Sequence, residues 1–149
     1  MSDAVHELNT LWHARFPIAR AMDLRAVLYD EFTLSTVAPL VGNTNIHDTA
    51  FAGSLYAMQA MTCWGLLHLA LADAGLDGSI IQADGEIKFH RTITSDIEAL
   101  SICRELPEHF VELRERGKVR MTLTASTRGQ SDNDSACEFS GTYVVRLNR

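Results

Sequence analysis

The sequence predicts an α+β domain in which an antiparallel sheet curls around one long apolar helix. From Thr49 to Ala72 the chain contains no Asp, Glu, Lys or Arg. A helix over this window is apolar nearly all the way round, so it belongs at the centre of a fold. Four consecutive strand patterns follow it and supply the enclosing surface. An amphipathic helix precedes both features.

Size and composition favour a single domain over residues 1–149. With 46% apolar and 21% charged residues, a chain of this length can bury a substantial core. The net charge is −6 and Lys and Arg are scattered singly, so nucleic acid is not an expected partner. The N-terminus has no basic segment followed by an apolar stretch, so we expect a cytoplasmic location. Cys63, Cys103 and Cys137 form no Cys-x-x-Cys pair and are expected to be free thiols.

The first elements are a helix and a hairpin. Asp3 is the expected N-cap of the helix, which ends before Pro17. Its apolar residues recur at helical spacing: Val5, Leu8, Leu11, Trp12 and Phe16. From Leu24 to Val37 apolar residues alternate with others, and 29–31 interrupts them as a turn, which indicates a strand or a hairpin.

The charge-free window is also long enough to cross a membrane. Gln59 and His68 lie inside it, and its flanking residues, Asp48 and Asp73, are acidic rather than basic. These features favour the central helix of a soluble fold, so no membrane partner is expected.

The four strand patterns cover residues 79–93, 97–106, 118–128 and 135–147. In the last two, apolar and polar residues alternate cleanly, which indicates one buried and one solvated face. Residues 94–96 and 129–134 have the composition of hairpin turns. Pro107 to Gly117 reads as a short helix, with Pro near its start and Gly after its end.

A sheet curled around one long apolar helix is the arrangement known as the hot-dog fold. Two strings support this topology: Asn43-x-Asn45-x-His47-x-Thr49-x-Phe51-Ala52-Gly53-Ser54-Leu55-Tyr56, and Ile87-Lys-Phe-His-Arg-x-Ile-x-Ser-Asp96. In these strings the chain resembles the hot-dog thioesterase family that includes the C-terminal domain of YiiD-type acetyltransferase fusions. Thr92 and Ser95 replace the Pro and Gly that are usual in the second string. The resemblance covers essentially the whole chain and implies acyl-thioester hydrolysis.

Thioester hydrolysis requires an activated nucleophile and a donor for the developing oxyanion. Residues 52–54 are expected at the start of the long helix, where backbone N–H groups lack partners and the helix dipole is positive. Because Gly53 has no side chain to block a carbonyl oxygen, its N–H is the predicted oxyanion donor. Tight packing of Gly53 against a strand is the alternative.

The loop before the helix carries the other predicted catalytic groups. His47 titrates near neutral pH and can serve as a general base or orient a water molecule. Asp48 is the one carboxylate of the motif, with base or nucleophile as its catalytic role and helix N-cap as its structural one. Asn45 can position water or the thioester oxygen, although loops also use Asn in side-chain turns.

The predicted substrate-binding residues are Asn43, Ser54, Gln59, Phe89 and Arg91. Other hot-dog thioesterases carry an Asp or Glu inside the central helix, but the matching stretch here, residues 58–61, has only Gln59 as a polar residue. Glutamine can orient water but cannot take a proton, which also argues against dehydratase chemistry. Arg91 suits the phosphates of coenzyme A or of a phosphopantetheine carrier, with a solvated surface role as the alternative. His68 is expected to be a core histidine.

The leading hypothesis is a hydrolase of acyl-CoA or acyl-carrier-protein thioesters that uses no metal or redox cofactor. A non-catalytic binder of an acyl or other apolar ligand is the alternative, and an assembly scaffold is a third. A single hot-dog layer leaves an edge strand to cover, so we expect a homo-oligomer, dimer or tetramer, with the site near the interface.

Overall fold

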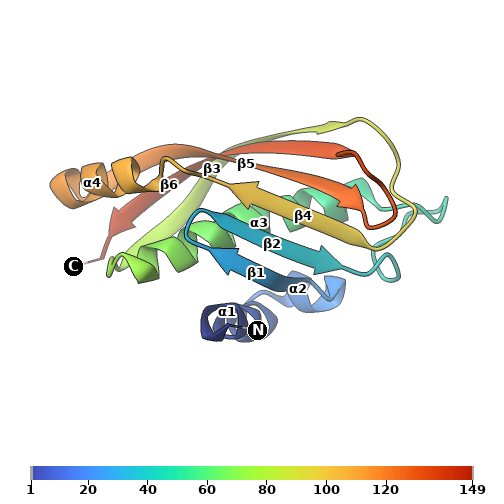
Figure 1. The fold of residues 1–149 in the computed structure, drawn as a ribbon, viewed down its shortest axis with the longest axis horizontal. Helices are drawn as coiled ribbons and strands as arrows, with labels where there is room; N and C mark the ends of the chain where they lie inside the picture. Colours follow the sequence, from blue (N-terminus) through green and yellow to red (C-terminus); the bar gives the residue numbers. More distant parts are fainter. Residues whose placement is uncertain (1, 149) are drawn as a thin grey trace.

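The computed structural model describes residues 2–148. Along the chain the elements are α1 (Asp3–Arg15), α2 (Pro17–Met22), β1 (Arg25–Asp30), β2 (Thr33–Ala38), α3 (Ala52–Asp73), β3 (Gly78–Phe89), β4 (Ile97–Ile102), α4 (Leu106–Arg116), β5 (Lys118–Gly129) and β6 (Cys137–Leu147). Every strand pairing is antiparallel, and the strand order is β1-β2-β4-β5-β6-β3. The sheet curls around α3, which confirms the predicted hot-dog fold (Figure 1).

The central helix α3 is enclosed because its surface is apolar. Its most apolar window has a mean hydropathy of 1.2, enough for a membrane span by composition, but 67% of that window is buried inside the fold. Three hydroxyls that enter the core with it are paired, whereas the buried Gln59 carboxamide oxygen has no partner within residues 2–148. Thr36 donates to the Thr62 hydroxyl (2.8 Å), Thr62 donates to the Met58 carbonyl (2.7 Å), and Tyr143 donates to the Ala60 carbonyl (2.9 Å). These bonds remove most of the cost of burying hydroxyls.

The ends of several elements differ from the sequence prediction, and the short helix α2 was not predicted. Ser2, not Asp3, is the N-cap of α1, and its hydroxyl accepts from the Val5 amide at 3.3 Å. Strand β3 ends at Phe89 rather than residue 93, because the His90 amide turns to the Ala136 carbonyl just before β6. Strand β4 ends at Ile102, since residues 103–105 lead into α4.

The two edge strands of the sheet differ in how their backbone is covered. At β1, the Asn9 side chain donates to the Ala26 carbonyl (2.9 Å) and accepts from the Ala26 amide (2.7 Å), so α1 covers this edge at Ala26. At the other edge, β3 pairs only with β6 among residues 2–148. Two apolar side chains of β3 are open to solvent, with 61% of Ile81 and 50% of Phe89 exposed. The long strand β3 is therefore the open edge of this chain.

Gly65 marks a close approach between α3 and its surroundings. A Cβ atom there would lie 2.7 Å from the Trp12 ring and 2.9 Å from a Leu34 methyl group. We predict that Gly65→Val lowers the free energy of unfolding by about 1–3 kcal/mol through overpacking. Urea unfolding measures this change in the free energy of unfolding. The matched control is Ala72→Val, at an exposed position of α3. Equal stability of the two variants would contradict this packing.

Candidate functional site

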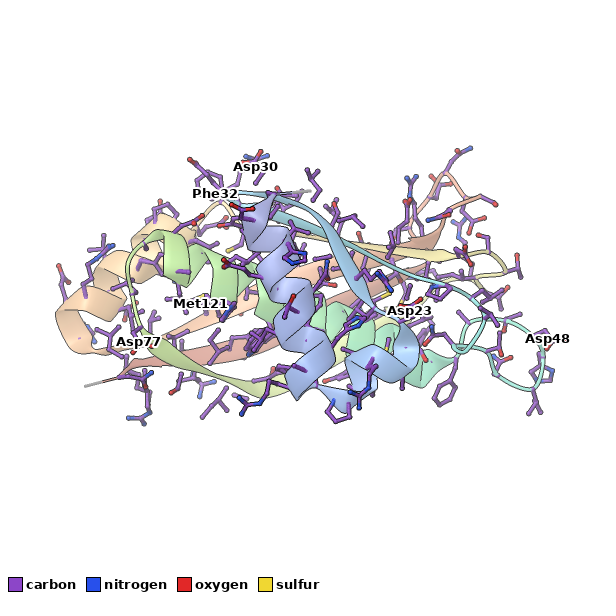
Figure 2. All side chains as sticks on the ribbon, turned by 90° about the horizontal axis from the view of Figure 1, so that it is seen from below. Asp23, Asp30, Phe32, Asp48, Asp77 and Met121 are labelled. Atoms are coloured by element: carbon purple, nitrogen blue, oxygen red, sulfur yellow. The ribbon has the colours of Figure 1, made fainter. Side chains whose placement is uncertain are left out.

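The predicted catalytic loop is a small hairpin that extends past the end of the sheet. A bridge pairs Thr44 with Ala50, and the Asn45 amide donates to the Thr49 carbonyl at 2.9 Å. Asp48 lies near the tip with a φ of 62°, a left-handed conformation that Asp tolerates better than most residues. Figure 2 shows Asp48 at the extreme end of the long axis. The hairpin therefore holds residues 45–49 away from the body of the domain.

The Asn45 side chain holds this hairpin together. Its carboxamide oxygen accepts from the amides of His47 (2.9 Å) and Thr49 (3.2 Å), and its NH₂ donates to the Thr49 hydroxyl (2.8 Å). These are the side-chain turn bonds named as the alternative role of Asn45. The Asn45 side chain therefore orients His47 and Thr49, and its hydrogen-bonding groups are largely used within the turn.

His47 and Asp48 are the exposed polar side chains of the tip. Neither side chain has a hydrogen bond or ion pair within residues 2–148. Both are therefore free to meet a ligand or a second chain.

The start of α3 presents unpaired amides. Phe51 is the N-cap residue and provides no side-chain cap, so the prediction of Asp48 as a possible N-cap is wrong. Within the described chain, the N–H groups of Ala52, Gly53 and Ser54 have no acceptor, whereas Leu55 already donates to Phe51 at 3.0 Å. Three donors at the positive end of a helix form a ready anion site.

The side-chain atoms nearest to Gly53 belong to its neighbour Phe51, not to a strand. A Cβ atom on Gly53 would collide with the edge of the Phe51 ring. The Phe51 ring is 51% exposed, so an apolar side chain lies beside the amide donors at the surface. Together with Thr44, Asn45 and Ile46, Phe51 lines an open hollow of about 520 Å³.

Asn43 and Gln59 are buried and do not reach this hollow. Asn43 is 1% exposed, and its NH₂ donates to the carbonyls of Met22 (2.9 Å) and Pro39 (2.8 Å). Gln59 is fully buried, and its NH₂ donates to the Leu55 carbonyl (3.1 Å) and the Cys137 sulfur (3.3 Å). Their positions do not support the predicted contact with substrate, because both amides are used to pack the core.

Phe89 and Arg91 lie near the base of the loop. The Ala50 amide donates to the Ile93 carbonyl at 2.9 Å, which ties the segment after β3 to the hairpin. Phe89 is half exposed, and the Arg91 guanidinium lies 3.9 Å from the Asp134 carboxylate. A surface pair at this distance is weak, so Arg91 stays available to an anion.

Gln82 and Tyr56 form a polar pair beside the open edge strand β3 that was not predicted from the sequence. The Gln82 NH₂ donates to the Tyr56 hydroxyl at 3.1 Å, and the strand bulges between Gln82 and Asp84. Tyr56 packs so closely on Gly85 that a Cβ atom there would overlap its hydroxyl oxygen. Bulges next to functional sites are common, but they depend on strand pairing and leave little trace in one sequence.

His68 is half-buried rather than a core residue, and the three cysteines are buried. The His68 ring stacks on Trp64 with ring centroids 4.8 Å apart, and burial lowers its pKa. Burial raises the pKa of the Cys63 thiol to about 12 and that of Cys103 to about 11. All three cysteines are free and buried, which confirms the prediction of free thiols.

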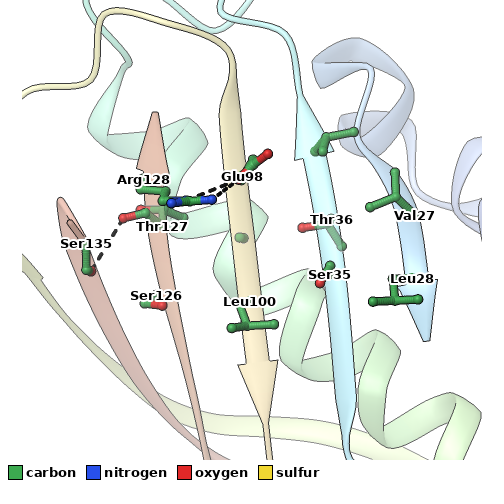
Figure 3. Close-up of a pocket in the computed structure, with 12 residues that line it drawn as sticks. Val27, Leu28, Ser35, Thr36, Glu98, Leu100, Ser126, Thr127, Arg128 and Ser135 are labelled. Carbon is green, nitrogen blue, oxygen red and sulfur yellow. Dashed lines mark hydrogen bonds and ion pairs between the residues drawn. The ribbon is translucent and has the colours of Figure 1, made fainter. Parts of the chain in front are cut away.

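A second group of hollows lies on the outer face of the sheet. One of about 510 Å³ crosses β1, β2, β4 and β5, with Leu100 between Ser35 and Ser126 (Figure 3). At its end Arg128 pairs with Glu98 at 3.0 Å. This trough contains none of the predicted catalytic residues.

The comparison with protein families identifies the class of protein to which the chain belongs. The model of a family described as "Putative thioesterase (yiiD_Cterm)" matches residues 5–147. The chain belongs to this family. This thioesterase assignment agrees with the resemblance inferred from the two motif strings.

Solved structures show the same thioesterase fold over the whole chain. A structure from Shewanella oneidensis described as a "putative thioesterase" has 29% identity and a TM-score of 0.88, covering 99% of this chain and 100% of that one. A protein of unknown function from Chlorobaculum tepidum has 27% identity and a TM-score of 0.89, covering 97% and 94%. A Haemophilus influenzae thioesterase, at 13% identity, TM-score 0.78 and coverage of 99% and 93%, shares the fold.

The role of Asn45 can be tested without an activity assay. We predict that Asn45→Ala speeds amide hydrogen exchange at residues 46–49 by about tenfold or more, because hydrogen bonds that hold the turn are lost. Asn45→Asp is the matched control, since it keeps the acceptor oxygen for the His47 and Thr49 amides. Unchanged exchange in Asn45→Ala would show that the hairpin does not depend on this side chain.

Proposed function

We propose that this protein hydrolyses acyl thioesters of coenzyme A or of an acyl carrier protein. The observation that carries the proposal is the uncapped start of α3, where the amides of residues 52–54 have no acceptor within residues 2–148. An oxyanion formed from a thioester carbonyl is the group that such donors stabilise best. Membership of the thioesterase family supports the same reaction class.

In this proposal the Gly53 N–H receives the oxyanion. Gly53 leaves the approach to its amide open except for the Phe51 ring, whose apolar surface suits an acyl chain or a thiol arm. His47 or Asp48 activates the attacking water, because their side chains are free while that of Asn45 is committed to the turn. The collapsing intermediate expels the thiol, which takes up a proton.

We further propose that the working unit is a dimer joined along β3. An edge strand of this length, with Ile81 61% exposed and without the side-chain cap that Asn9 gives β1, favours pairing with a second copy. The exposed tip residue Ile46, 93% accessible, also favours a covering chain. A two-fold axis across β3 would extend the sheet and bring each hairpin to the far end of the partner's β3.

A non-catalytic binder is the second candidate. It is favoured by one observation: α3 has no carboxylate between Ala52 and Ala72, and its one amide, Gln59, is buried against β6. Such a protein would hold an acyl group in the same hollow without turnover. A ligand that raises the melting temperature and is recovered unchanged would support this function over hydrolysis.

The reaction is tested with short to long acyl-CoA esters and acyl carrier protein. We predict thiol release by the purified protein, and a fall in kcat/KM of about 10²-fold or more in His47→Ala, which loses the base. His6→Ala, in the exposed part of α1, is the matched control. No thiol release above background by the unchanged protein would refute the hydrolase.

The oxyanion donor is tested by removing one N–H. Gly53→Pro deletes the amide hydrogen in the first turn of a helix, where proline is tolerated, and should lower kcat by about 10²–10³-fold. Ala52→Pro deletes the neighbouring N–H and should have a much smaller effect. Gly53→Ala keeps the N–H but crowds Phe51, so a loss as large as that of Gly53→Pro would mean that crowding, not the donor, matters.

The dimer is tested by light scattering at micromolar concentration. We predict twice the chain mass for the unchanged protein and a monomer for Ile81→Lys, because this variant places a charge in the proposed interface along β3. Ile18→Lys, at a site 52% exposed on α2, is the control and should stay dimeric. A monomeric unchanged protein would contradict the proposal.

A further inference from the structure

The outer face of the sheet carries a cluster of unpaired cations, Lys118, Arg120 and Arg146. Lys118 and Arg146 are directly opposite across β5 and β6, and Arg120 is diagonal to Arg146 because it pairs with Val144. All three side chains are exposed. Within residues 2–148 none of them forms an ion pair or a side-chain hydrogen bond.

This clustering is unfavourable for the isolated chain. Like charges directly opposite on a sheet face repel each other. The chain has a net charge of −6, and carboxylates that could pair with these cations are plentiful in it. A feature that breaks a local rule without compensation in the fold is typical of a functional site.

A hollow beside the cluster is suited to a phosphorylated nucleotide. It has a volume of about 660 Å³, within the range of small-molecule sites. Arg120 and the hydroxyls of Thr122 and Thr142 line it, and the exposed Ile102 adds apolar surface against which a base can pack. Its carboxylate, Glu105, accepts from the Cys103 thiol at 3.7 Å and forms no ion pair with Arg120.

The position of the cluster indicates which site it serves. Strand β6 runs from Cys137, paired with Phe89 near the hairpin, to Leu147, paired with Gly78. These ends are about 33 Å apart at strand geometry, so the cluster is remote from the amides of its own α3. Figure 2 shows Asp77, just before β3, toward the opposite end of the molecule from Asp48. In the proposed dimer, antiparallel pairing of β3 brings the partner's hairpin to the Gly78 end.

We infer that Lys118, Arg120 and Arg146 bind the phosphates of the nucleotide part of coenzyme A and that they serve the partner's thioester site. This inference rests on the proposed function and names its thiol carrier. Arginine and lysine are suited to phosphate, and the hollow next to them has room for the base. An acidic carrier protein would need the charges but not the hollow, so the hollow favours the nucleotide.

Binding is tested without turnover by calorimetric titration with adenosine 3′,5′-bisphosphate, a phosphorylated nucleotide that lacks a thiol arm. We expect saturable binding that weakens with added salt, and a Kd about tenfold or more higher in the double variant Lys118→Gln, Arg146→Gln. Arg15→Gln, Arg25→Gln removes the same charge at the other side of the domain and should bind as the unchanged protein does. The melting temperature of the first variant should be equal or higher, since a repulsive pair is lost.

Kinetics separate this inference from the proposed function. The double variant Lys118→Gln, Arg146→Gln should show a higher KM for acyl-CoA with kcat retained. Its KM for the same acyl group on pantetheine, which has no nucleotide, should be unchanged. Hydrolysis of acyl-CoA with no change in KM would overturn the cation site and leave the hydrolase standing. Bisphosphate binding that is lost in the variant, with no hydrolysis of any ester, would overturn the hydrolase and support the site. An effect confined to acyl carrier protein would overturn the nucleotide assignment.

Discussion

The burial of α3 is the constraint on which the rest of the structure depends. A helix with no charged residue from Ala52 to Ala72 cannot lie on a surface in water without exposing a large apolar area. The sheet must therefore curl around it, and the hydroxyls of Thr36 and Thr62 that enter the core pair with each other. Curling brings β1 and β3 to the two margins of the sheet and leaves the start of α3 open at one end.

The two margins then take different roles. Asn9 satisfies the backbone of Ala26 at the β1 edge, so part of that edge is covered within the chain. The β3 edge has no such cap and carries Ile81 in solvent, which is unfavourable for a monomer. The proposed dimer, the partner's hairpin at the Gly78 end and the nucleotide site on the outer face all follow from this difference.

The candidate site was only partly predictable from the sequence. The motif string located the loop and the helix start, because the mostly polar residues 43–49 give way to an apolar helix within one short stretch of the chain. It did not separate the free side chains of His47 and Asp48 from the committed one of Asn45. Nor did it show that Gln59 faces the core, since a helix that is apolar all round has no pattern that tells its faces apart.

By itself the sequence determined the fold class, the order of the main elements and the family, because these depend on local periodicity and on a motif that is continuous in the chain. Only the tertiary structure decided that α2 forms, which side chains crowd Gly53 and Gly85, and which cations lie opposite one another. Tertiary contacts join residues far apart in the sequence, such as Asn9 with Ala26 or Lys118 with Arg146. Such pairs are set by strand register and packing, which no single stretch of sequence encodes.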